Sequence, residues 1–122
     1  MPQGSIDWLE IPASDLDASP KFYEKVFGWK IMRDDKWPDF PMFKDAGGKM
    51  SGGFSKQAKP NTEPGILLYI TVDDIDAALA KVKANKGTPV QKKTTISEEV
   101  GWWASFKDPG GNTMGLFQTV KR

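Results

Sequence analysis

The chain has 122 residues, of which 39% are hydrophobic and 27% charged, and its formal net charge is +1. That length holds one hydrophobic core of ordinary size, so we expect a single domain over 1–122. The chain contains no cysteine and no histidine. These two absences exclude disulfides, thiolate metal sites and any mechanism that needs a Cys nucleophile or a His base.

Charge and hydropathy also limit the partners. Acidic and basic residues are interleaved, and the only arginines are Arg33 and Arg122, so we expect no nucleic-acid partner. No apolar run approaches membrane-spanning length, and the chain does not open with a basic stretch followed by an apolar one. We therefore predict a cytoplasmic protein without a membrane partner, which the lack of cysteine suits.

Residues 6–11 alternate between polar and apolar side chains, as in a strand with two different faces. A helix is expected over about 20–27, with Ser19 as its cap and Pro20 at its first position. Gly28 is the expected stop signal of that helix. Strands should follow at about 29–33, 40–44 and 49–55.

The second half begins after a linker-like stretch at 57–65, which is rich in proline and polar residues. A strand at 66–72 precedes a helix that Asp73 and Asp74 cap and that ends near 85–87. Further strands are expected at about 88–93, 101–107 and 113–119, with a strong turn at 108–112.

The two halves repeat one pattern 59 positions apart. Residues 11–18 (Ile-Pro-Ala-Ser-Asp-Leu-Asp-Ala) align with residues 70–77 (Ile-Thr-Val-Asp-Asp-Ile-Asp-Ala). Such repeats indicate like units that bury their apolar faces against each other. The sequence therefore predicts an α+β fold made of two βαβββ modules, at about 5–56 and 66–120.

Two such modules resemble the vicinal oxygen chelate superfamily, the group of glyoxalase, bleomycin resistance protein and extradiol dioxygenases. The resemblance is carried by both repeat copies, by Phe-Tyr-Glu-Lys-Val-Phe-Gly-Trp at 22–29 and by Asp-Pro-Gly-Gly-Asn at 108–112. Gly-Trp-Trp-Ala-Ser-Phe at 101–106 looks most like an uncharacterised glyoxalase-like branch. The resemblance implies two curved mixed sheets around a cavity, with helices covering their outer faces.

In that family a metal ion, where present, is held by His, Glu or Gln side chains that point into the cavity. The matching positions here are Trp8, Leu67, Gly115 and about Gly52. None of these side chains can donate a lone pair to a metal. We therefore expect no metal and no other cofactor, and the resemblance predicts the fold without the family's metal chemistry.

Strand alternation sorts the remaining candidates by face. Leu9 and Ile11 should face the helices, as should Leu68, Ile70, Val72, Met114 and Leu116. The residues expected to line the cavity and bind a ligand are Trp8, Glu10, Leu67, Tyr69, Trp103 and Phe117.

Glu10 is the one acid in this set and therefore the candidate catalytic residue, because a buried carboxyl group can act as a general acid or base. The alternatives are that Glu10 faces solvent or a basic side chain, and that Trp8 only plugs the space of an absent metal.

Three functions stay open. The first is a metal-free protein that binds a small hydrophobic or aromatic molecule. The second is a glyoxalase-like lyase or isomerase that uses Glu10 or metal ligands outside the aligned positions, and the third is a non-catalytic interaction module. In each case we expect a homodimer that covers the sheet edges. Its modules could pair within one chain or swap with those of the partner through the linker 57–65.

Overall fold

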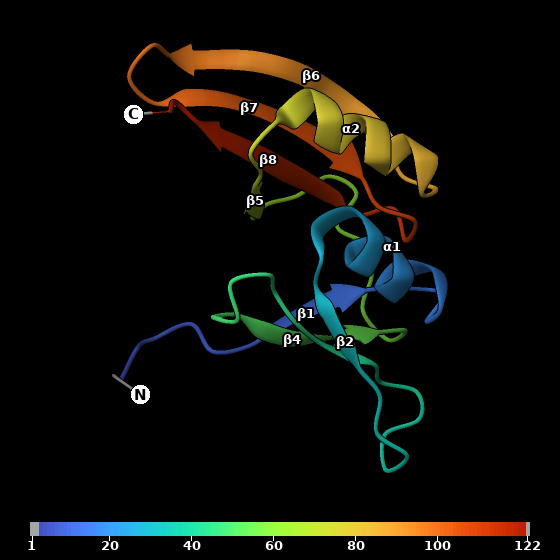
Figure 1. Ribbon diagram of the computed structural model, residues 1–122. Coiled ribbons are helices and arrows are strands. Elements are labelled where there is room, and N and C mark those ends of the chain that lie inside the picture. The colour runs from blue at the N-terminus through green and yellow to red at the C-terminus, as the bar shows by residue number, and fades with distance from the viewer. Residues whose placement is uncertain (1–2, 122) are drawn as a thin grey trace.

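The computed structural model describes residues 3–121, which form two four-stranded sheets and two helices (Figure 1). Strand order is β1-β4-β3-β2 in the first sheet and β5-β8-β7-β6 in the second. In each sheet the first strand of the module pairs in parallel with the last, and the other pairs are antiparallel. The predicted α+β fold of two βαβββ modules is confirmed.

The first module consists of β1 (Leu9–Pro12), α1 (Ala18–Phe27), β2 (Lys30–Met32), β3 (Met42–Lys44) and β4 (Ser51–Ser55). The second consists of β5 (Tyr69–Thr71), α2 (Ile75–Ala84), β6 (Thr88–Ser97), β7 (Gly101–Lys107) and β8 (Thr113–Thr119). Strand β6 is longer than predicted. It lies at the edge of its sheet, where a strand pairs on one side only and tolerates polar side chains.

Helix α1 begins two residues before its predicted start. The expected cap, Ser19, is buried inside the helix, and the N-cap is Asp17, whose side chain makes no capping bond. The carboxylate of Asp15 instead accepts hydrogen bonds from the backbone N–H groups of Asp17 and Ala18, each at 2.9 Å. These bonds, chiefly the one from Ala18, hold the pKa of Asp15 below its ordinary value. Pro20 is tolerated because first-turn N–H groups need no helical partner.

The other predicted helix signals are confirmed. Gly28 ends α1 with a φ of 72°, a left-handed conformation that glycine adopts without strain. Helix α2 begins at its predicted cap, where Asp74 accepts a hydrogen bond from the backbone N–H of Ala77 at 3.2 Å.

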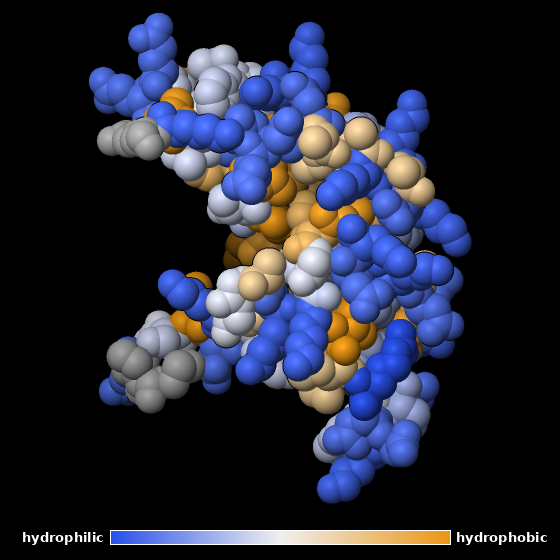
Figure 2. Space-filling view, in the orientation of Figure 1, coloured by the Kyte–Doolittle hydropathy of each residue, from blue (hydrophilic) through white to orange (hydrophobic). Residues whose placement is uncertain are grey.

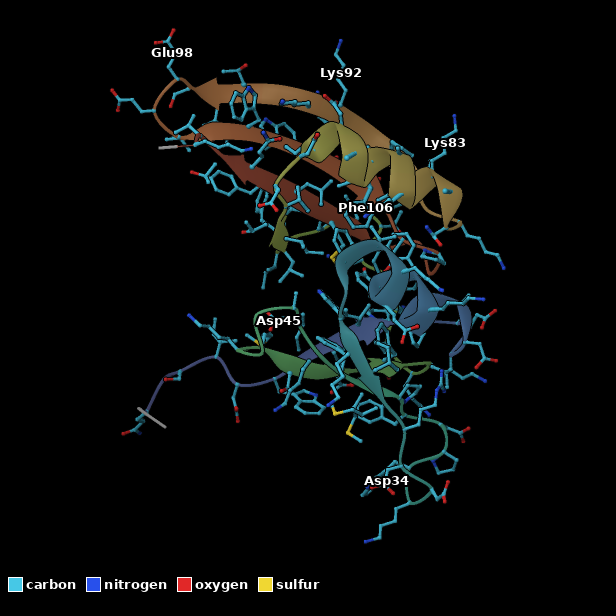
Figure 3. The ribbon with its side chains drawn as sticks, viewed as in Figure 1. Asp34, Asp45, Lys83, Lys92, Glu98 and Phe106 are labelled. Carbon is cyan, nitrogen blue, oxygen red and sulfur yellow. The ribbon has the colours of Figure 1, made fainter. Side chains whose placement is uncertain are left out.

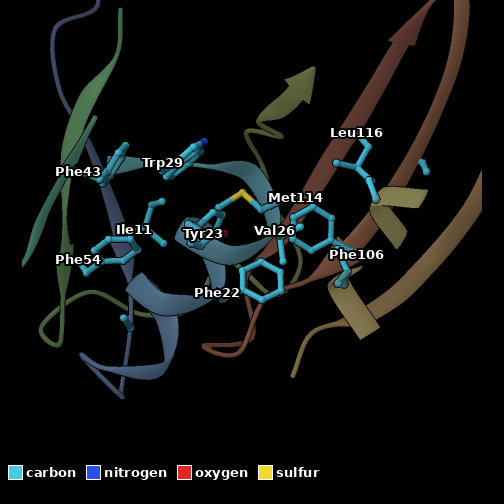
Figure 4. Close-up of a cluster of buried hydrophobic side chains, with 14 of the residues drawn as sticks. Ile11, Phe22, Tyr23, Val26, Trp29, Phe43, Phe54, Phe106, Met114 and Leu116 are labelled. Carbon is cyan, nitrogen blue, oxygen red and sulfur yellow. The ribbon is translucent and has the colours of Figure 1, made fainter. Parts of the chain in front are cut away.

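One hydrophobic core lies between the two sheets and includes both helices (Figure 4). The predicted inward-facing residues Ile11, Met114 and Leu116 are buried in it, and Leu9, Leu68 and Ile70 pack against it. The helices therefore lie between the sheets of one chain, whereas the resemblance placed them outside. In consequence, the helix-free faces of the two sheets point away from each other.

A buried polar network joins the two modules. The hydroxyl of Tyr23 on α1 donates to Asp108 at 2.7 Å. Asn112 donates through Nδ2 to the Pro12 carbonyl at 2.7 Å and accepts through Oδ1 from the backbone N–H of Asn61 at 2.8 Å. The predicted turn after β7 thus binds the end of β1 and holds the linker in place.

Burial shifts the pKa values of two groups in this network, Asp108 and Tyr23. It raises the pKa of Asp108, although the hydrogen bonds that its carboxylate accepts, the largest from Asn112, act in the opposite direction. Burial also raises the pKa of Tyr23 well above its ordinary value, and the neighbouring charge of Asp108 adds to the effect.

Candidate functional site

We call the helix-free surface of the first sheet face A and that of the second sheet face B. Face A carries Glu10, and also Trp8 through its ring contact with Phe40, which lies over Gly53. Face B carries Tyr69, Trp103 and Phe117. Because the core lies between the sheets, the two faces are on opposite sides of the molecule (Figure 4). The structure therefore does not bring all six predicted ligand-binding residues together within one chain.

Three predicted side chains meet on face B. Tyr69, Trp103 and Phe117 line an open hollow of about 450 Å³ together with Thr71 and Ile96. The strand register explains the cluster, because Phe117 on β8 lies between Trp103 on β7 and Thr71 on β5. The lining is mainly apolar and aromatic, with the hydroxyls of Tyr69 and Thr71 as polar groups. Such a surface suits a small organic molecule.

Face A holds the other two predicted strand residues. Trp8 is 45% exposed, and its ring lies nearly parallel to that of Phe40, with 6.3 Å between centroids and 20° between planes. Glu10 is exposed to solvent. Within one chain Glu10 thus fits the solvent-facing alternative rather than a buried general acid. Leu67 lies two residues before the start of β5, is half-buried, and does not line the hollow on face B.

A second hollow of about 450 Å³ was not predicted and lies between the modules on the helix-facing side. Leu9, Phe27, Leu68 and Ile70 contribute apolar lining, and the turn at Asp45 forms part of its wall. Figure 2 shows apolar residues inside the concave side of the molecule. Strand alternation predicts that Leu9, Leu68 and Ile70 face the core. They do pack against it, but they stay partly exposed because the hollow separates the two modules there.

Charged side chains lie mostly at the periphery. Figure 3 shows Lys83, Lys92 and Glu98 pointing away from the second sheet, whereas Phe106 points toward the core. Among the described residues, no helix is both long and apolar enough to cross a membrane.

The positions at which the resemblance implies metal ligands do not suit a metal. Trp8 and Leu67 are apolar, and Gly115 on face B has no side chain. Within residues 3–121, no three His, Cys, Asp or Glu side chains lie close enough together to hold a metal ion. Divalent metals need several such donors at short range, so this set of residues does not fit one.

The fourth aligned position is shifted by one residue. Gly52 faces the core, because a Cβ added there would meet the ring of Phe43 at 2.7 Å. Gly53 pairs with Glu10 and is therefore the neighbour of Gly52 that lies on face A. The expected position, about Gly52, thus falls on the core side of β4, and Gly53 beside it also offers no side-chain donor.

Comparison with known proteins places this geometry in a family. The family described as the Glyoxalase/Bleomycin resistance protein/Dioxygenase superfamily matches residues 5–116. A glyoxylase-like domain-containing protein from Didymella fabae is 29% identical over 124 residues, which cover 93% of this chain and 92% of that protein. A putative glyoxylase, CFP32, from Mycobacterium bovis is 30% identical and matches 95% of this chain, but the chain spans only 46% of its length.

Solved structures show the same fold. A hypothetical protein, SA1046, from S. aureus has a TM-score of 0.74 at 23% identity, with 97% of this chain and 95% of that chain covered. TnmS3, an antibiotic binding protein from Streptomyces sp. CB03234, has a TM-score of 0.70 at 24% identity, with 98% and 99% covered.

Proposed function

The chain belongs to the glyoxalase/bleomycin resistance protein/dioxygenase superfamily, and we propose that it is a metal-free member that binds a small hydrophobic or aromatic molecule on face B. The hollow between Tyr69, Trp103 and Phe117 is the observation that carries this proposal. Its apolar wall would exclude water from a bound ring, and its hydroxyls would orient the ligand. TnmS3 is described as antibiotic binding, so proteins of this fold include one that binds an antibiotic.

The chemistry of face B favours binding over catalysis. The lining residues Tyr69, Thr71, Ile96, Trp103 and Phe117 include no carboxylate, amine or imidazole. Glu10, the candidate acid, lies on face A of the same chain. Within a single chain, the Tyr69 phenol is therefore the one group at the hollow of a kind that acts as a general acid or base.

A homodimer would complete the site. Trp8 and Tyr69 are 45% and 51% exposed although they are large and aromatic, and each lies on a helix-free face. Exposed apolar surface of this kind is typical of protein contacts. If face A of one copy covers face B of the other, a two-fold axis generates two equal sites. Each site then combines Trp8 and Glu10 of one copy with Tyr69, Trp103 and Phe117 of the other, which are the predicted ligand-binding residues apart from Leu67.

The binding proposal is tested by screening small aromatic and aliphatic compounds against the purified protein, with tryptophan fluorescence and thermal shift as readouts. At least one compound should quench fluorescence and raise the melting temperature. Phe117→Ala should weaken its binding by about 10-fold or more, because a Phe side chain in an apolar contact is worth about 1.5–3 kcal/mol. Ile66→Ala is the control, since Ile66 is 85% exposed and lies outside the hollow. Equal binding by both variants would contradict the proposal.

The dimer is tested by mixing two variants. Trp8→Ala removes the face A contact from both sites of its homodimer, and Phe117→Ala removes the face B contact from both sites. After unfolding and refolding together, the mixed dimer carries both changes in one site and neither in the other, so binding should return at about half of the mixed dimer's sites. A lack of recovery, or a solution mass of one 13.5 kDa chain, would refute the shared site.

A further inference from the structure

We infer that each sheet presents a flat aromatic platform seated on a glycine, so that the bound molecule is a planar ring system held by stacking. The inference deepens the proposed function and rests on it. The two platforms are the ring of Tyr69 over Gly115 on face B and the ring of Phe40 over Gly53 on face A.

The platform on face B follows from the register of β5 and β8. Tyr69 pairs with Gly115, and a Cβ added to Gly115 would lie 2.5 Å from the nearest atom of the Tyr69 ring. The ring therefore occupies the space that any larger residue at 115 would take. Tyr69 is nevertheless 51% exposed. One face of its ring rests on the bare strand, and the other is open to a ligand.

The platform on face A is also a ring over a glycine, but the ring comes from a loop residue, Phe40, and not from the neighbouring strand. A Cβ added to Gly53 would meet only atoms of the Phe40 ring as its nearest neighbours. Phe40 comes from the loop before β3, where its backbone N–H donates to the Trp37 carbonyl at 3.1 Å. The nearly parallel ring of Trp8 lies beside it. Together these two rings present aromatic surface around Gly53.

The two glycines hold equivalent positions in the repeat. Gly53 pairs with Glu10 and Gly115 pairs with Tyr69, and Glu10 and Tyr69 lie 59 positions apart, which is the repeat offset. Both glycines sit in strands that are paired on both sides. Glycine is unfavourable inside a strand unless a ring or a ligand approaches the backbone closely there. The recurrence at both positions indicates a requirement for a flat surface.

A flat surface selects ligands by shape. Aromatic rings attract each other in offset stacks, an effect worth about 2- to 10-fold in affinity for each pair beyond the area buried. In the proposed dimer the two platforms would face each other across the site. A planar ring system could then stack on both, whereas a puckered aliphatic molecule of equal size could stack on neither.

The test uses 2-naphthol and decahydro-2-naphthol, which share a carbon skeleton and a hydroxyl group but differ in planarity. Calorimetric titration of the wild-type protein should show about 10-fold or stronger preference for 2-naphthol. Gly115→Ala should reduce that preference by about 2- to 10-fold, the contribution of one platform, because the added methyl group tilts Tyr69 off the strand. Gly65→Ala is the matched control, since nothing lies within 4 Å of a Cβ added there.

The outcomes separate the two proposals. If neither naphthol nor any screened compound binds, the proposed function fails, and the platforms fail with it. If both naphthols bind equally to the wild-type protein, or if Gly115→Ala keeps the preference, the platforms are refuted while binding stands. Should Gly115→Ala not fold, Tyr69→Leu and Phe40→Leu serve instead, because they keep apolar cover but remove the flat rings. Each variant should lower the preference for 2-naphthol, and an unchanged preference in both would refute the inference.

Discussion

Replacing Asn112 by Ala tests whether the buried polar network holds the two modules together. The Asn112 side chain is fully buried. Its loss leaves the Pro12 carbonyl and the Asn61 backbone N–H without the bonds of 2.7 and 2.8 Å that they make to it. Asp108 keeps its bonds from Tyr23 and from two backbone N–H groups, so its carboxylate stays satisfied.

The expected loss of stability follows from the Pro12 carbonyl and the Asn61 backbone N–H. An unsatisfied buried polar group costs about 1–3 kcal/mol, and both groups are only partly buried, so we expect a loss of about 2–4 kcal/mol in the free energy of unfolding. The entropy of unfolding is about 2.1 cal/mol/K per residue, which for a chain of this length converts that loss to about 8–16 °C in melting temperature.

Urea unfolding followed by tryptophan fluorescence measures the loss, and a thermal melt checks the conversion. Asn61→Ala is the matched control, because it makes the same change nearby and removes only an exposed side-chain bond to the Ile66 carbonyl at 3.2 Å. The control should lose less than about 0.5 kcal/mol. Equal losses in the two variants would refute the stabilising role assigned to Asn112.

Two further predictions concern single substitutions in and next to α1. Tyr23→Phe should lower the free energy of unfolding by about 1–3 kcal/mol at pH 8, because it removes the hydroxyl that donates to Asp108. Since burial raises the folded-state pKa of Tyr23 above its ordinary value of 10.0, the wild-type advantage is complete below pH 10 and declines as pH rises further. A deficit in urea unfolding that stays constant from pH 8 to 11 would contradict this. Gly28→Ala should cost about 1 kcal/mol, because alanine is strained at a φ of 72°. Gly65→Ala has no such φ and should be nearly neutral in a thermal melt.

Local patterns predicted most of the fold. The repeat 59 positions apart indicated two equal modules, and strand alternation correctly assigned Ile11, Met114 and Leu116 to the core. Alternation can be used in this way because side-chain direction alternates along any strand, whatever the strand packs against. The start of α1 was missed because Asp15 competes with Ser19 for the capping role, and only the folded loop shows which carboxylate or hydroxyl reaches the free N–H groups.

The candidate site was predicted less completely. Tyr69, Trp103 and Phe117 do meet on face B. Phe40 was missed because it lies in a loop, where no periodicity shows which way a side chain points. The position expected near Gly52 falls on the core side, because a shift of one residue along a strand exchanges its two faces.

By itself the sequence determined the two modules, the residues of each sheet that share a face, and the lack of metal donors at the aligned positions. Only the tertiary structure decided that both helices pack between the sheets, so that faces A and B point apart. The reason is that alternation separates the two faces of one sheet but carries no information on how two sheets are oriented. That orientation depends on long-range packing, here of Tyr23 and Phe22 on α1 against residues from both modules.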